Sequence, residues 1–111
     1  ERVEAFSLRQ EENAAVIVVR SSITAESESR LQKLYREALA LDKSRIVLHF
    51  SENAAVSGAG IAVLTQLLLD SQKQGKTVVA SGLSKNLKKV FEIVGLAKLV
   101  TLFASLEDAL A

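Results

Sequence analysis

The stretch that decides the fold of this chain is RIVLHFSENAAVSGAGIAVL, residues 45–64. It opens with an apolar run that is β-branched at its centre, which is typical of a short buried strand. A turn of small and polar residues follows, and Ser57 then stands where a serine oxygen can cap the N-terminus of a helix. The stretch therefore predicts a strand over residues 45–50 and a helix that runs from Ser57 to about Gln74.

Elements of the same two kinds alternate along the rest of the chain. Further strands are predicted over residues 3–8, 14–19, 77–82 and 99–103, and further helices after Thr24, Ser84 and Ser105. The order is β-β-α-β-α-β-α-β-α, and strands that alternate with helices form right-handed parallel crossovers. We therefore expect an α/β fold with a mixed, mostly parallel sheet of about five strands and about four helices, in which the first two strands form an antiparallel hairpin.

Apolar side chains recur at helical spacing in three of the predicted helices, so each of these should bury one face. The inward positions are Leu31, Leu34, Tyr35, Ala38 and Leu41 in the first helix, Ile61, Leu64, Leu67 and Leu68 in the second, and Leu87, Val90, Phe91 and Val94 in the third. Gly75 and Gly95 follow the second and third helices, where glycine tolerates the left-handed conformation of a helix end.

Composition restricts the classes of function. A chain of 111 residues with 49% hydrophobic residues can form one packed core, so residues 1–111 are expected to be a single domain. Lys and Arg number 14 against 13 Asp and Glu, and this balance argues against non-specific nucleic-acid binding or a polybasic membrane anchor. The absence of cysteine excludes disulfides and thiolate metal sites and fits a cytoplasmic protein.

The first residues and the most apolar stretch are where the sequence could carry export and membrane signals. Residues 54–69 are apolar but interrupted by polar side chains and shorter than a membrane span requires, so we expect no direct membrane insertion. The charged first residues show no signal peptide. The chain contains no methionine, which indicates a domain trimmed or excised from a longer protein.

The sequence offers little for catalysis. His49 is the only histidine, and no cluster of ligands at metal-binding spacing accompanies it, so we expect no enzyme activity, no metal and no cofactor. The run SGAG, residues 57–60, lacks the Lys-Ser/Thr ending of a phosphate loop. Its small residues can let the helix start pack closely, although free backbone N–H groups at a helix start also attract anions. Lys85, Lys88 and Lys89 form either a solvated face or a docking patch for an acidic partner.

The stretches RIVLHFSENAAVSGAGIAVL and GKTVVASGLSKNLKKVFEIVGLAKLVTLFASLEDAL resemble the STAS domain of the anti-sigma factor antagonist family. That family has an apolar strand, an Asp-Ser-Ser-Gly switch loop, a long helix and a glycine-ended strand, followed by a helix that runs into Gly-Leu and by a final helix. The likeness covers nearly the whole chain and rests on the order and spacing of these features. It implies a STAS-type fold.

The switch loop departs from the family pattern. Gly60 and the residue after it match the pattern, but Ser57 stands at the family's aspartate, Gly58 at its phosphorylated serine and Ala59 at the next serine. The resemblance therefore implies a switch without its phosphoacceptor, so that phosphorylation at the usual position does not regulate the domain. Ser57 is a candidate displaced phosphosite, and its alternative role is that of helix cap.

The resemblance implies a non-enzymatic protein-interaction module of bacterial signalling and transcription regulation. Its partner would be an anti-sigma factor or another histidine-kinase-like regulatory protein, or a further STAS protein. The expected binding surface comprises Ser51, Glu52, Ser57, Gly58, Ala59, Gly60, Ser81 and Lys85. Two alternatives stay open: an accessory domain or subunit of a membrane transporter (a lipid ABC complex or an anion permease), and a regulatory domain that binds a small ligand.

Overall fold

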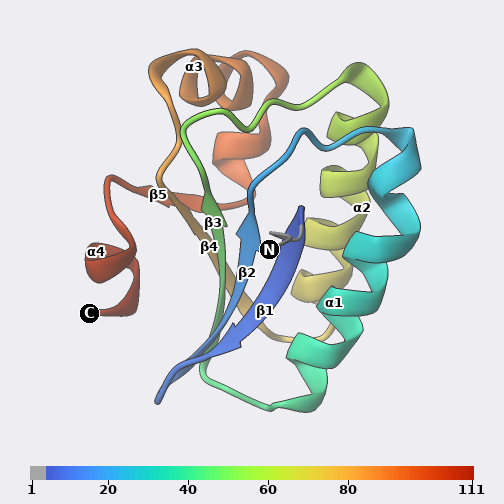
Figure 1. The fold of residues 1–111 in the computed structure, drawn as a ribbon. Helices are drawn as coiled ribbons and strands as arrows, with labels where there is room; N and C mark the ends of the chain where they lie inside the picture. The colour runs from blue at the N-terminus through green and yellow to red at the C-terminus, as the bar shows by residue number, and fades with distance from the viewer. Residues whose placement is uncertain (1–4) are drawn as a thin grey trace, which may run out of the picture.

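The computed structural model describes residues 5–111, and a five-stranded sheet lies at its centre (Figure 1). The strands are β1 (Phe6–Gln10), β2 (Ala14–Val19), β3 (Arg45–Phe50), β4 (Thr77–Ser81) and β5 (Thr101–Phe103), and they lie side by side in that order. The β1–β2 pair is antiparallel and all other pairs are parallel. The predicted hairpin and the predicted parallel crossovers are thus confirmed.

Four α-helices join these strands: α1 (Glu28–Ala40), α2 (Gly58–Lys73), α3 (Lys85–Val94) and α4 (Leu106–Leu110). Short 3-10 turns, η1 (Ala25–Ser27) and η2 (Leu96–Lys98), precede α1 and follow α3. The predicted fold class and the order β-β-α-β-α-β-α-β-α are therefore confirmed. Within residues 5–111, no helix combines the length and the apolar character that crossing a bilayer requires.

The two faces of the sheet are covered unequally. Figure 1 shows α1 and α2 against one face and the short α4 against the other. Alternate residues of the central strands, such as Ile46 and Leu48, join the large core beneath α1 and α2, while Val47 between them belongs to the smaller core beneath α4. Leu64 and Leu68 of α2, predicted to be buried, are 0% and 1% exposed. Most of the buried apolar side chains therefore lie between the sheet and the α1–α2 layer, where the hydrophobic effect stabilises the fold.

The serine caps and the glycine helix end that the sequence predicted are present in the structure. Ser57 Oγ accepts a hydrogen bond from the Gly60 N–H at 3.0 Å, and Ser84 Oγ accepts one from the Leu87 N–H at 3.2 Å. Each bond satisfies a backbone donor that the first turn of a helix otherwise leaves unpaired. Gly75, just after α2, has a φ of 71°, in the left-handed region that glycine adopts without strain.

Several predicted boundaries shift. The first strand was predicted over residues 3–8, of which 3 and 4 lie outside the described residues, and it continues to Gln10 because its ladder with β2 extends to that residue. The last strand begins at Thr101 rather than at residue 99. The N–H groups of Leu99 and Val100 donate instead to the Leu96 carbonyl at 2.9 and 3.1 Å, which closes a helical turn. Residues 25–27 form η1, so α1 itself begins only at Glu28.

The predicted apolar face of α3 is buried only in part. Leu87 and Phe91 are 4% and 0% exposed, whereas Val94 is 43% exposed and Val90 is half-buried. Helical spacing correctly identified residues that share a side of the helix. The prediction that Val94 is buried is wrong, since Leu87 and Phe91 are the buried residues of this helix.

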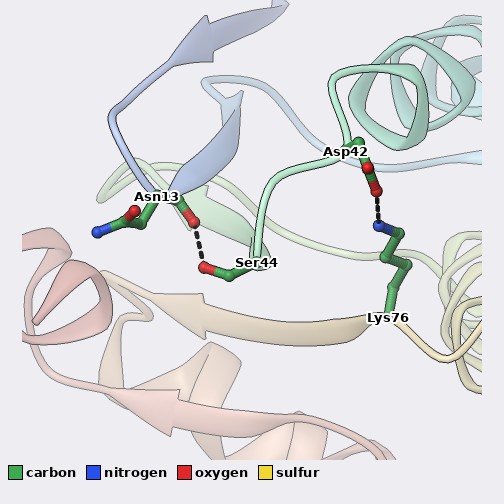
Figure 2. Close-up of polar contacts among 4 residues, drawn as sticks. All are labelled: Asn13, Asp42, Ser44 and Lys76. Atoms are coloured by element: carbon green, nitrogen blue, oxygen red, sulfur yellow. Dashed lines mark hydrogen bonds and ion pairs between the residues drawn. The ribbon is translucent and has the colours of Figure 1, made fainter.

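Polar contacts between loops hold together the end of the sheet where the parallel strands begin (Figure 2). Lys76 Nζ lies 2.6 Å from a carboxylate oxygen of Asp42, and Ser44 Oγ donates to the Asn13 carbonyl at 2.7 Å. The hydrogen bond and positive charge of Lys76 lower the pKa of the Asp42 carboxyl below its usual range. These contacts tie together the segments that lead into β2, β3 and β4.

Candidate functional site

The opposite end of the sheet, where the parallel strands finish, carries the residues predicted to bind a partner. Neighbouring parallel strands β3 and β4 pair in register up to His49 and Ser81, so the segments that leave them emerge at the same edge. One segment, residues 51–57, leads into α2, and the other, residues 82–84, leads into α3. The fold therefore brings both halves of the predicted surface to one end of the molecule.

Only some of the predicted residues reach the surface of that end. Glu52, Ser57, Gly58, Ala59 and Lys85 are exposed, Ser51 is half-buried, and Gly60 and Ser81 are buried. Gly60 and Ser81 are therefore covered in the isolated domain, and the binding surface itself stays a prediction. Gly60 packs against Ile23 and Val56, and Ser81 lies beside His49 within the sheet.

Gly60 fixes the turn against the connection between β2 and α1. A Cβ at this position would overlap the Ile23 carbonyl oxygen and would lie 3.0 Å from Cγ1 of Val56. The Ile23 N–H donates to the Ala55 carbonyl at 2.8 Å, and the Ser57 N–H donates to the Ile23 carbonyl at 3.0 Å. Only glycine leaves room for this approach, so the start of α2 is held rigidly.

Ser81 supports His49 from the neighbouring strand. The Ser81 hydroxyl, on a residue that is 0% exposed, lies 2.8 Å from His49 Nδ1. Burial, together with the nearby positive charge of Arg9, lowers the pKa of His49. The neutral imidazole is therefore hydrogen-bonded to a buried serine, which is a usual environment for a histidine within an apolar strand. Gly82, with a φ of 75°, then turns the chain directly over this ring.

Ser51 lies where β3 ends. Its N–H donates to the Val19 carbonyl at 2.8 Å, which extends the contact between β2 and β3 by one step. Its hydroxyl oxygen is buried and has no hydrogen-bond partner within residues 5–111. An unpartnered buried hydroxyl is destabilising, and the sequence contained no signal of it.

The exposed start of α2 lacks reactive groups. Ser57 Oγ is occupied as the acceptor of the Gly60 N–H, and nothing lies within 4 Å of the position that a Cβ would take at Gly58. Within residues 5–111, no three His, Cys, Asp or Glu side chains gather where they could hold a metal ion. The arrangement suits contact with another molecule, because its exposed backbone and small side chains allow close approach.

Beside this helix start lies a hollow that was not predicted from the sequence. We call it the alanine hollow; its volume is about 200 Å³, and Ala25, Glu28, Ala59, Ala62, Val63 and Gln66 line it. The positions 59, 62, 63 and 66 show helical spacing, which was a signal for one shared side of α2. The other wall comes from η1 and α1, and no pattern in the sequence joins these distant segments.

Comparison with known proteins identifies the family. Residues 6–101 match the family model described as the Mlab STAS domain. The chain belongs to the STAS domain family. The resemblance inferred from the strand, turn and helix of residues 45–64 is thus confirmed. The positions that it assigned to the switch loop, residues 57–60, form the N-cap and the first residues of α2 in this STAS domain.

Solved structures similar to this STAS domain include three with different descriptions. A candidate anti-sigma factor antagonist from Thermotoga maritima is 13% identical, with a TM-score of 0.81 over 95% of this chain and 91% of the other. Unphosphorylated SpoIIAA, an anti-sigma factor antagonist known from Bacillus, is 16% identical, with a TM-score of 0.74 over 96% and 93%. A sulfate transporter family protein from Wolinella succinogenes is 13% identical, with a TM-score of 0.74 over 89% and 83%. At these identities the similarity concerns the fold alone.

Proposed function

We propose that this STAS domain is a non-enzymatic protein-interaction module of bacterial signalling that works in the cytoplasm as an anti-sigma factor antagonist. Its partner is an anti-sigma factor or another histidine-kinase-like regulatory protein, or a further STAS protein. The observation that carries the proposal is the exposed start of α2, where Ser57, Gly58 and Ala59 stand uncovered beside the alanine hollow. The similarity in fold to two anti-sigma factor antagonists supports the same choice.

The physical case rests on what this surface can offer a partner. Small side chains bring the backbone of α2 within reach, and the N–H groups of its first turn carry partial positive charge. The hollow next to Ala59 can accept an apolar side chain, as the anchor residues of interfaces usually require. Gly60 holds this surface rigid, so that little ordering entropy opposes binding.

Regulation at this surface is proposed to lack the usual phosphate switch. A phosphate group adds about −1.5 to −2 charges, enough to repel a partner from the centre of an interface. Gly58, at the position that the resemblance gives to the acceptor, has no hydroxyl and cannot form a phosphoester. Ser57 has a hydroxyl, but its oxygen accepts the Gly60 N–H as the cap of α2. Binding is then set by concentration or by other parts of the protein.

The interaction surface is tested by Ala59→Arg, which places a long charged side chain at the lip of the alanine hollow. We expect a pull-down with the purified anti-sigma factor to lose the complex while the thermal midpoint stays nearly unchanged, because Ala59 is exposed. Ala40→Arg is the matched control, since Ala40 is an exposed alanine at the far end of α1. Equal binding by both variants would place the interface elsewhere.

The regulatory part is tested with the serine kinase that acts on ordinary family members. The unaltered domain should remain unmodified in mass spectrometry, whereas the double variant Ser57→Asp, Gly58→Ser should take up one phosphate and then bind its partner more weakly. Stoichiometric phosphate on Ser57 of the unaltered domain would instead establish a displaced switch.

A second candidate function is that of an accessory domain or subunit of a membrane transporter. It is favoured by the Mlab description of the matching family and by the similar fold of the Wolinella succinogenes sulfate transporter family protein. Co-purification distinguishes the two proposals. A transporter accessory should elute with a membrane complex after detergent extraction, and Ala59→Arg should then release it from that complex rather than from an anti-sigma factor.

A further inference from the structure

Helix α3 exposes an apolar face that nothing in the described chain covers. Ile93 is 77% exposed and Val94 is 43% exposed, although Leu87 and Phe91 anchor the same helix in the core. Lys89 precedes Ile93 by four residues and Lys85 by eight, so all three side chains lie along one side of the helix. We call this side, Lys85, Lys89 and Ile93, the α3 patch.

The α3 patch lies in the most basic part of the molecule. Residues 85–98 contain four lysines and a single acidic residue, Glu92, whereas the whole chain has a net charge of only +1. The remainder of the chain is therefore acidic on balance. Within residues 5–111, neither Lys85 nor Lys89 forms an ion pair, so both charges face solvent. A positively charged apolar face of this kind fits a surface that is apolar at its centre and acidic at its rim.

The alanine hollow has that chemistry. Its floor is built from alanines and Val63, and Glu28 stands on its wall. Glu26, two residues earlier in η1, is exposed as well. A hollow of about 200 Å³ has room for one aliphatic side chain, and the Glu28 carboxylate lines it. The described residues thus include both the basic α3 patch, with its exposed isoleucine, and the alanine hollow, with a carboxylate on its wall.

We propose that these two surfaces bind each other between copies of this chain, with Ile93 of one copy in the alanine hollow of the next. Figure 1 shows α3 apart from the start of α1, so the α3 patch and the alanine hollow are separate surfaces. If each pair of copies makes this contact once, one patch and one hollow stay free, and the copies join head to tail. Unless the rotation between copies closes a ring, such contacts continue into open chains.

The proposal goes beyond the proposed function and does not rest on it, although both use the alanine hollow. Because Ala59 lines the hollow, a neighbouring copy and a partner protein would compete for the same place. The contact is small, and small interfaces between proteins are generally weak. Self-association is therefore expected only at high local concentration.

The first measurement is sedimentation velocity of the purified chain from about 10 μM to about 1 mM, with no partner present. The expected result is an average mass that rises with concentration past that of a dimer and falls again as added salt screens the charges. Ile93→Ser should abolish the rise. A mass that stays monomeric over the whole range overturns the proposal, as does a rise that Ile93→Ser leaves unchanged.

Charge reversal provides the decisive test. Variant one carries Lys85→Glu and Lys89→Glu and so has two acidic surfaces; variant two carries Glu26→Lys and Glu28→Lys and has two basic ones. Each should remain monomeric alone, and an equimolar mixture should associate again, which also demonstrates that both are folded. A chain with Lys33→Glu and Lys73→Glu is the matched control, because it changes the net charge equally at exposed positions of α1 and α2 and should associate as the unaltered chain does.

Failure of the mixture to associate, when both variants keep the circular dichroism of the unaltered chain, contradicts the head-to-tail contact. Another occupant of the α3 patch is distinguished with vesicles. Binding to vesicles of phosphatidylglycerol and phosphatidylcholine, lost in variant one, by a chain that stays monomeric would assign the patch to an anionic membrane surface instead. Neither result depends on an anti-sigma factor, so the proposed function is tested separately.

Discussion

Replacing Gly60 by alanine should destabilise this STAS domain, although alanine is the better helix former. The added methyl group would overlap the Ile23 carbonyl oxygen, and this oxygen cannot easily move because it accepts the Ser57 N–H at 3.0 Å. Overpacking of this kind costs about 1–3 kcal/mol, and a strained or lost hydrogen bond costs about 1 kcal/mol more. The higher helix propensity of alanine offsets about 1 kcal/mol of this loss. The expected net loss in the free energy of unfolding is about 2 kcal/mol.

Gly58→Ala is the matched control, since it makes the same chemical change two residues earlier in α2. Nothing lies within 4 Å of the new methyl group, so only the backbone entropy of the unfolded chain changes. The control should be neutral or stabilised by up to about 1 kcal/mol. Urea unfolding followed by circular dichroism measures the free energy of unfolding of both variants. In a thermal scan, the midpoint of Gly60→Ala should fall by about 8 °C. Two variants of equal stability would refute the close contact between α2 and the Ile23 carbonyl.

Three further predictions concern the core and the titratable groups. Leu64→Ala should lower the free energy of unfolding by about 2–5 kcal/mol in urea, because Leu64 is 0% exposed, whereas Leu69→Ala at a 45% exposed position should cost under about 1 kcal/mol. Tyr35→Phe removes the hydroxyl that donates to an Asp70 carboxylate oxygen at 2.7 Å, so calorimetry should show a loss of about 1 kcal/mol, and an unchanged midpoint would argue against this bond. Because folding lowers the pKa of His49 below 6.5, the unfolded chain binds the proton more readily, and the stability present above pH 6.5 should decline below it. His49→Gln should flatten this decline in urea titrations, and a slope that persists unchanged would assign it to other groups.

Local signals made much of the fold predictable. Ser57 and Ser84 mark helix starts because a serine oxygen satisfies free N–H groups wherever it precedes a helix, whatever the tertiary surroundings. Gly75 marks a helix end for a similarly local reason. The alternation of strands and helices then restricts the topology, since parallel neighbours need a crossover. The boundaries were predicted less accurately, as the 3-10 turn before Thr101 demonstrates.

The candidate site could be predicted only in outline. Its place followed from chain order, because the segments after β3 and β4 must leave the same edge of a parallel sheet. Burial within the site did not follow. Ser81 resembled a surface serine in the sequence but is 0% exposed and lies beside His49. The pairing of two strands set that environment, and no single stretch of sequence contains it.

The sequence by itself determined the elements, their order and the absence of a hydroxyl at Gly58, because hydrogen-bond capping, backbone freedom and side-chain chemistry are properties of residues and their near neighbours. Tertiary structure alone decided that Gly60 touches the Ile23 carbonyl, that α2 and η1 enclose a hollow, and that Ile93 stays exposed. These outcomes depend on the distance between segments far apart in the chain. The packing of the whole core sets that distance, and periodicity within one helix carries no information about it.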